Sequence, residues 1–152
     1  MTASGAAHSP AQSGWLEFWS RPHSVYVNRR HLEAHCRRIA LDLRALLGGR
    51  ESPTVLDYGC GEALSAPALA EATGRLYLFD AAAPTRARLA ARYGGGPDIV
   101  LLDEAGLAAL PPGGVDVAVL CSVIQYLDRA DLDRTLTRLA GLLAPGDRKS
   151  VV

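Results

Sequence analysis

The pattern of apolar residues changes along the chain, from helical spacing before position 50 to short continuous runs after it. In residues 29–47, apolar side chains recur at steps of three and four, as on one face of an amphipathic helix. Asn28 is a good N-cap for this segment, and Gly48-Gly49 supplies its end. We therefore predict one helix over residues 29–47. Its apolar stripe consists of Leu32, Cys36, Ile39, Leu43, Leu46 and Leu47.

Beyond residue 50, runs rich in strand-forming residues alternate with Ala- and Leu-rich segments. Continuous apolar strands separated by helices are typical of a parallel sheet with helices on both faces. We predict an α/β fold with a doubly wound parallel sheet, and a Pro- and Gly-rich loop before its fourth strand. The expected strands cover residues 54–58, 76–79, 98–102 and 115–120, with a fifth beginning at 150–152. The expected helices cover residues 67–73, 84–93 and 131–143.

Charge is unevenly distributed, although the net charge of the 152 residues is zero. Residues 1–50 carry seven arginines and three acids, and the remainder has the opposite excess. Much of the basic excess lies in the predicted helix, so we interpret it as a solvated helix face and do not expect a nucleic-acid partner. Lys149 is the only lysine, which excludes Schiff-base chemistry in the body of the domain.

Cys36, Cys60 and Cys121 are far apart in the sequence and form no C-x-x-C pair. We expect neither a disulfide scaffold nor a metal site, and reduced thiols fit a cytoplasmic protein. Residues 1–14 have neither the basic nor the apolar region of a signal peptide, so we predict a flexible tail there. No apolar run has the length needed to span a membrane, and we expect no membrane partner.

A glycine turn follows the first predicted strand. Gly59 and Gly61 stand where the chain can pass close to a ligand, because no side chain blocks the approach. Asp57 lies at the end of that strand, and Asp80 ends the second strand 19 residues after Gly61. This is the spacing at which an acid accepts hydrogen bonds from ribose hydroxyls. A tight turn with a solvated strand-end Asp is the alternative, but the combined features favour a nucleoside.

Two residues argue against a dinucleotide. Leu64 occupies the position of the third small residue in the pyrophosphate fingerprint. Glu62 places a negative charge at the helix N-terminus that would otherwise attract a phosphate. The chain also has neither a P-loop nor the Tyr-x-x-x-Lys pair of nicotinamide-dependent reductases. A cationic ligand without phosphate, such as S-adenosylmethionine (SAM), fits this acid-rich turn better.

Several segments resemble the class I SAM-dependent methyltransferases, in the family's order and spacing, over roughly residues 25–152. The resemblance implies a Rossmann-like fold, SAM as the cofactor and methyl transfer to a small molecule. The matching segments are 55–61 (Val-Leu-Asp-Tyr-Gly-Cys-Gly, motif I), 76–80 (Leu-Tyr-Leu-Phe-Asp, motif II), 110–127 (the fourth strand and its loop) and 139–146 (the turn before the fifth strand).

The resemblance assigns roles to the residues around the glycine turn. It implies that Gly59 and Gly61 line the methionine portion of the cofactor. Asp57 would orient the turn or the cofactor amine, and Asp80 would accept hydrogen bonds from the ribose. The chain departs from motif I at Ala63, where a third glycine often stands.

The same resemblance extends to the adenine end. It implies that Ala81 packs beside adenine and that Asp103 accepts a hydrogen bond from the adenine amino group. The segment that follows Asp103 is longer than is common in the family. Cys60 and Cys121 belong to the predicted cofactor site as small packing residues rather than as nucleophiles.

Substrate-facing positions are expected on two other segments. Gln125 and Tyr126 occupy the loop in which family members often present such side chains. Tyr26 and His31 belong to residues 15–50, a helical cap that we expect to cover the cofactor, and Trp19 is a further candidate to line this cap. The sequence identifies no catalytic base and no metal ligand, and it does not determine the oligomeric state.

The predicted SAM-binding domain, residues 51–152, lacks its C-terminal strands. The family's complete fold has seven strands, and this chain ends where the fifth would begin. We expect either a fragment of a longer enzyme or a reduced protein completed by a partner. A non-catalytic binding module is therefore the alternative to a methyltransferase.

Overall fold

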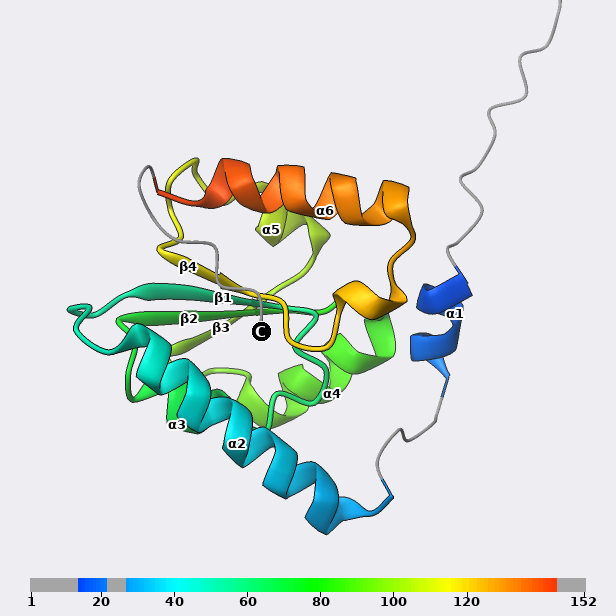
Figure 1. Ribbon diagram of the computed structural model, residues 1–152, viewed down its shortest axis with the longest axis horizontal. Helices are drawn as coiled ribbons and strands as arrows, with labels where there is room; N and C mark the ends of the chain where they lie inside the picture. The colour runs from blue at the N-terminus through cyan, green and yellow to red at the C-terminus, as the bar shows by residue number, and fades with distance from the viewer. Residues whose placement is uncertain (1–13, 22–26, 145–152) are drawn as a thin grey trace, which may run out of the picture.

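Four parallel strands form the centre of the fold, in the order β3-β2-β1-β4. The computed structural model describes residues 14–21 and 27–144. Within this part of the chain the strands lie between two layers of helices (Figure 1), which confirms the predicted doubly wound parallel sheet. The strands are β1 (Thr54–Tyr58), β2 (Arg75–Phe79), β3 (Ile99–Leu102) and β4 (Val117–Val119).

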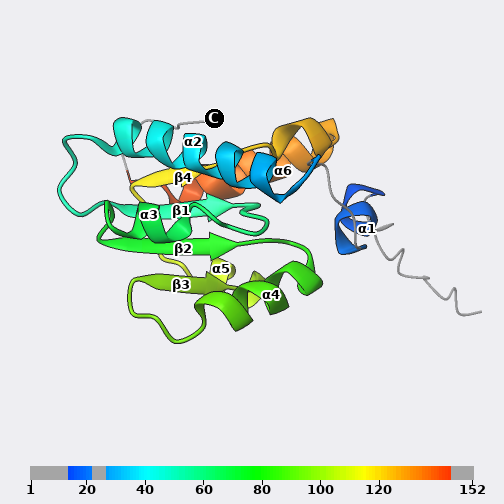
Figure 2. The same ribbon diagram turned by 90° about the horizontal axis from the view of Figure 1, so that it is seen from below.

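Helices α2, α3 and α4 cover one face of the sheet, and α5 and α6 cover the other (Figure 1). The short helix α1 lies beyond the carboxyl ends of the strands, as both views show (Figure 2). The helices are α1 (Gly14–Ser20), α2 (Arg29–Leu47), α3 (Ala66–Ala70), α4 (Ala83–Tyr93), α5 (Glu104–Ala108), the 3₁₀ turn η1 (Ile124–Tyr126) and α6 (Arg129–Leu142).

Each face of the sheet has its own apolar core, because successive strand residues point to opposite faces. In β1, Val55 packs into the core beneath α2, α3 and α4, whereas Leu56 packs into the core beneath α5 and α6. Both side chains are fully buried. Their burial on both faces explains why the strands are continuous apolar runs in the sequence.

The long helix has the boundaries predicted from its pattern. The Asn28 side chain accepts a hydrogen bond from the His31 N–H at 2.9 Å, and the chain leaves the helix at Gly48. Helix α4 likewise has Pro84 in its first turn and Gly94 at its C-cap. These ends depend on side chains and glycines that act locally, so the sequence is sufficient to locate them.

Two helical segments differ most from expectation. The segment predicted as a loop before β4 contains helix α5, which the Asp103 side chain caps by accepting from the Gly106 N–H at 2.7 Å. Leu107 is the one residue of this helix that is buried, and a single buried position leaves no periodic pattern to read. Helix α3 ends at Ala70, three residues earlier than predicted, because Glu71–Thr73 form turns instead.

The outer edge of β4 is partly covered by the segment that leaves α6. The Val115 N–H donates to the Leu142 carbonyl and the Ala144 N–H donates to the Val115 carbonyl, both at 3.1 Å. This is a parallel bridge between Val115 and Leu143, so the chain begins to add a neighbour to β4. The fifth strand predicted at 150–152 and the tail predicted at 1–14, except for Gly14, lie outside the described residues. Within the described ranges, no helix combines the length and apolarity needed to cross a bilayer.

Candidate functional site

The glycine turn connects β1 to α3 at the carboxyl end of the sheet. The N–H groups of Gly59 and Cys60 both donate to the Phe79 carbonyl, at 2.8 and 3.1 Å, so the turn begins against the end of β2. Gly59 and Gly61 have φ values of 77° and 56°, which only glycine adopts readily. A Cβ at Gly59 would lie 2.5 Å from a methyl group of Val123, whereas one at Gly61 would meet no atom within 4 Å.

Asp80 ties the end of β2 to this turn. One carboxylate oxygen accepts from the Gly61 N–H at 3.0 Å, and the other accepts from the Ala82 N–H at 2.9 Å. Burial raises the pKa of Asp80 above its usual value, although these two hydrogen bonds oppose the rise. Each carboxylate oxygen has two lone pairs, so both can accept a further hydrogen bond from a ligand.

Asp57 is a buried carboxylate that pairs with no cation among the described residues. Its exposed fraction is 6%, and it makes no hydrogen bond or ion pair with the residues that the structure describes. Burial raises the pKa of Asp57 to about 7, and the negative charge of Asp80 adds to this effect. A buried charge of this kind is costly unless it is paired, so the site is suited to a ligand that brings a positive charge.

A pocket of about 900 Å³ opens above the turn. Its volume falls within the range of pockets that bind cofactors and other small molecules. The glycine turn, the end of β2 and the loop after β4 form one side, and α1, α2, η1 and α6 form the other. Gly61 is the point at which a ligand can approach the backbone most closely, since its Cα faces open space.

Most residues that were expected to bind the cofactor line this one pocket. They are Asp57, Gly59, Cys60, Gly61, Asp80, Ala81 and Cys121. Asp103 is not among the lining residues, and its side chain caps α5 instead. Of the expected substrate-facing residues, His31, Gln125 and Tyr126 line the pocket, while Tyr26 lies outside the described residues.

Helix α1 contributes two aromatic residues to the pocket, of which only Trp19 was predicted. The Trp15 indole N–H donates to a carboxylate oxygen of Asp131, at the start of α6, over 2.9 Å. The Trp19 ring meets the Tyr126 ring edge to face, with centroids 5.0 Å apart. The hydrogen bond between Trp15 and Asp131 joins residues more than a hundred positions apart. Such a contact leaves no local signal in the sequence, so only the fold could reveal it.

Helix α6 adds a polar wall that was also missed. Asp131, Thr135 and Arg138 line the pocket, and their spacing of four and three residues places them on one helix face. Arg138 forms an ion pair with Glu104 at 2.9 Å. The side chains of Thr135 and Arg138 face Tyr58 at the end of β1. Burial raises the pKa of the Tyr58 phenol, and Thr135 and Arg138 oppose that rise. This polar spacing was available in the sequence beside the leucine stripe.

All three cysteines line the pocket, although they come from α2, the glycine turn and the loop after β4. None forms a disulfide. Burial raises the pKa of each thiol, most strongly that of Cys60. Neutral thiols are poor nucleophiles and poor metal ligands, and no group of His, Cys, Asp and Glu within the described ranges is arranged to hold a metal ion.

Comparison with known proteins gives consistent matches. A family model described as a methyltransferase domain matches residues 55–146. An uncharacterized methyltransferase of Mycobacterium tuberculosis is 34% identical over 98 residues, which is 64% of this chain and 49% of the relative. The chain therefore spans about half the length of the curated relatives it matches.

Solved structures share the fold. A SAM-dependent methyltransferase from Leishmania major superimposes with a TM-score of 0.69 at 18% identity, over 88% of this chain and 57% of that one. A SAM-dependent methyltransferase from Aquifex aeolicus gives a TM-score of 0.61 at 19% identity, over 78% and 71% of the two chains. At these identities the likeness concerns the arrangement of strands and helices.

Proposed function

The chain belongs to the class I SAM-dependent methyltransferases, and from this premise we propose that it binds SAM above the glycine turn and methylates a small-molecule acceptor. SAM is the cofactor of this family. When bound, it would supply a methyl group on a sulfonium: the acceptor nucleophile would form a bond to the methyl carbon in line as the carbon–sulfur bond breaks, and S-adenosylhomocysteine would leave. The observation that supports the proposal best is the buried carboxylate of Asp57, unpaired among the described residues, beside an open glycine turn.

In this proposal the two aspartates bind different parts of the cofactor. Asp57 faces the ammonium and sulfonium end, where a positive charge compensates its buried negative charge. Asp80 accepts hydrogen bonds from the ribose while it holds the Gly61 N–H. Ala81 packs beside adenine. Asp103 does not line the pocket, and its side chain caps α5. Its hydrogen bond to the adenine amino group therefore stays a prediction.

Glu62, which argued against a phosphate ligand, contributes less charge than its sequence position suggests. Its carboxylate lies 3.6 Å from the Arg92 guanidinium and is almost half exposed. The negative character of the site therefore comes mainly from Asp57 and Asp80. Since both are buried beside the turn, a phosphate group would be disfavoured there and a cation favoured.

The acceptor is assigned to the side of the pocket formed by α1, α2, η1 and α6. Gln125, Tyr126 and His31 remain the proposed substrate-facing residues, and Trp15 and Trp19 close the end of this compartment. These residues exclude water and orient the acceptor, and alignment alone can contribute up to about 7–11 kcal/mol to such a displacement. We assign no general base, and the cytoplasm remains the proposed location.

Calorimetry with S-adenosylhomocysteine, the demethylated cofactor, tests the binding claim. We expect Asp80→Ala to weaken binding by about tenfold or more, since a hydrogen bond to a charged group contributes about 1.5–3 kcal/mol. Asp133→Ala is the matched control, because Asp133 is exposed on α6 and lies outside the pocket. Circular dichroism verifies that both variants are folded.

Absence of binding to the unsubstituted chain would overturn the proposal. Turnover is tested separately, by measuring the transfer of a labelled methyl group from SAM to the acceptor.

A further inference from the structure

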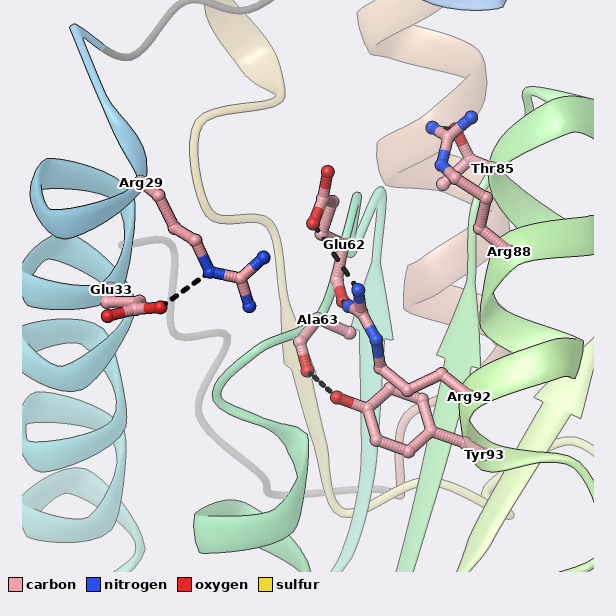
Figure 3. A network of polar contacts seen from close by, with 8 residues as sticks. All are labelled: Arg29, Glu33, Glu62, Ala63, Thr85, Arg88, Arg92 and Tyr93. Carbon is pink, nitrogen blue, oxygen red and sulfur yellow. Dashed lines mark hydrogen bonds and ion pairs between the residues drawn. The ribbon is translucent and has the colours of Figure 1, made fainter.

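The C-terminal half of the glycine turn is held from behind by the end of α4. The Tyr93 hydroxyl donates to the Ala63 carbonyl at 2.8 Å. Arg92 donates from Nη1 to the Glu62 carbonyl at 2.7 Å. Figure 3 shows these two side chains reaching together from α4 to consecutive residues of the turn. Neither Arg92 nor Tyr93 lines the pocket, so both contact the turn from its outer side.

The turn needs such support because of Ala63. This residue has a φ of 46°, in the left-handed region that a residue with a Cβ adopts only at a cost. Its side chain is buried in the core beneath α2, α3 and α4. The preceding part of the turn is held by hydrogen bonds to Phe79 and Asp80 of the neighbouring strand end. Around Ala63 the turn makes two backbone hydrogen bonds of its own, from the Ala63 N–H to the Cys60 carbonyl and from the Ala66 N–H to the Ala63 carbonyl. The side chains of α4 add the hydrogen bonds that come from a neighbouring element.

We propose that Arg92 and Tyr93 are positioning residues, which hold the carbonyls of Glu62 and Ala63 so that the turn keeps its cofactor-binding shape. This inference rests on the proposed function. It explains how position 63 can be an alanine, although a glycine would adopt the same backbone conformation without strain. The hydroxyl of Tyr93 stabilises the strained conformation, so its contribution depends on which residue occupies position 63.

That dependence defines the experiment. Binding of S-adenosylhomocysteine is measured by calorimetry for the unsubstituted chain, Tyr93→Phe, Ala63→Gly and the double variant. We expect Tyr93→Phe to raise the Kd by about three- to tenfold, as for one lost hydrogen bond. In the Ala63→Gly background we expect the same substitution to raise the Kd by less than about twofold, because glycine maintains the turn without support.

Two controls separate positioning from general stability. Tyr77→Phe also removes a phenolic hydroxyl, but Tyr77 lies in β2 against the opposite core, and its hydroxyl bonds to none of the described residues. We expect its Kd to stay within about twofold of the unsubstituted chain. Arg92→Met serves as a second test if Tyr93→Phe does not fold. Its control is Arg129→Met, at the start of α6, where the exposed guanidinium pairs with Asp133 and lies outside the pocket.

The outcomes are distinct. A Kd for Tyr93→Phe equal to that of the unsubstituted chain, or the same increase in both backgrounds, would overturn the positioning role. A loss of thermal stability with an unchanged Kd would show that Tyr93 only packs, and would overturn it as well. If the unsubstituted chain binds no S-adenosylhomocysteine, the proposed function fails first and this inference fails with it.

Discussion

Gly59 and Gly61 have similar backbone conformations but very different surroundings. A methyl group at Gly59 would meet Val123 at 2.5 Å, while one at Gly61 would point into open space. We expect Gly59→Ala to lower the free energy of unfolding by about 2–4 kcal/mol, through both backbone strain and the clash. Gly61→Ala should lower it by about 1–2 kcal/mol, through strain alone. Urea denaturation measures both, and equal losses would contradict the geometry described here.

The raised pKa of Asp57 makes stability depend on pH. In the unfolded chain the carboxyl has its ordinary pKa near 4, whereas burial raises the pKa of Asp57 to about 7 in the folded state. The folded state therefore binds a proton more tightly, and stability falls as pH rises from about 4 to 7. We expect Asp57→Asn to remove most of this decline, so that the variant is the more stable protein at pH 8. Thermal unfolding between pH 4 and pH 8 tests this, and parallel profiles would contradict it.

Residues whose role depends on the local chain were predictable, and those whose role depends on distant partners were not. The glycines at 59 and 61 and the acids at 57 and 80 could be identified because strand, turn and helix follow one another directly. Tyr93 left no signal, since a tyrosine at the end of a helix has many possible roles. Only the fold shows that its hydroxyl reaches residue 63.

At the scale of elements, α1 is the one α-helix of the described chain that packs over the pocket rather than on a face of the sheet. Its hydrogen bond from Trp15 to Asp131 joins the start of the described chain to α6. Both tryptophans of the protein lie in this helix. Their fluorescence therefore reports on α1 alone.

We expect Asp131→Ala to detach α1 and shift tryptophan emission to longer wavelength, because the indole rings become more exposed to water. The lost hydrogen bond should cost about 1 kcal/mol of stability. Asp131→Asn is the matched control, since its amide oxygen can still accept from Trp15 and its lost charge faces the exposed guanidinium of Arg134. If both variants emit like the unsubstituted protein, the contact does not hold α1 in place.

Element prediction succeeded where the pattern was long or its ends were marked. The boundaries of α2 follow from a 19-residue stripe with Asn28 and Gly48 at its ends. Helix α5 was missed because five residues with one buried position carry no period. The predicted β4 was too long because it included the apolar Val115. This residue is as buried as a strand residue, but it pairs with the segment after α6.

At the scale of the molecule, parallel strands place the ends of β1, β2 and β4 side by side, and the pocket forms where those ends meet α1, α2 and α6. This arrangement brings together three cysteines that are far apart in the sequence. It also sets Asp80 close enough to Asp57 for the negative charge of Asp80 to raise the pKa of Asp57. Among the described residues, the segment leading into β4 pairs with the segment after α6 through a single bridge, from Val115 to Leu143.

The sequence by itself determined the α/β class, the position of the glycine turn, the family and most of the residues that line one side of the pocket. These features depend on short-range periodicity, caps and spacing, which a single chain segment contains. Only the tertiary structure decided that Asp57 has no partner within residues 14–21 and 27–144, that α1 and α6 form the far wall, and that α4 holds the turn at Ala63. Each of these depends on contacts between residues remote in sequence, whose distances follow from the packing of the whole sheet.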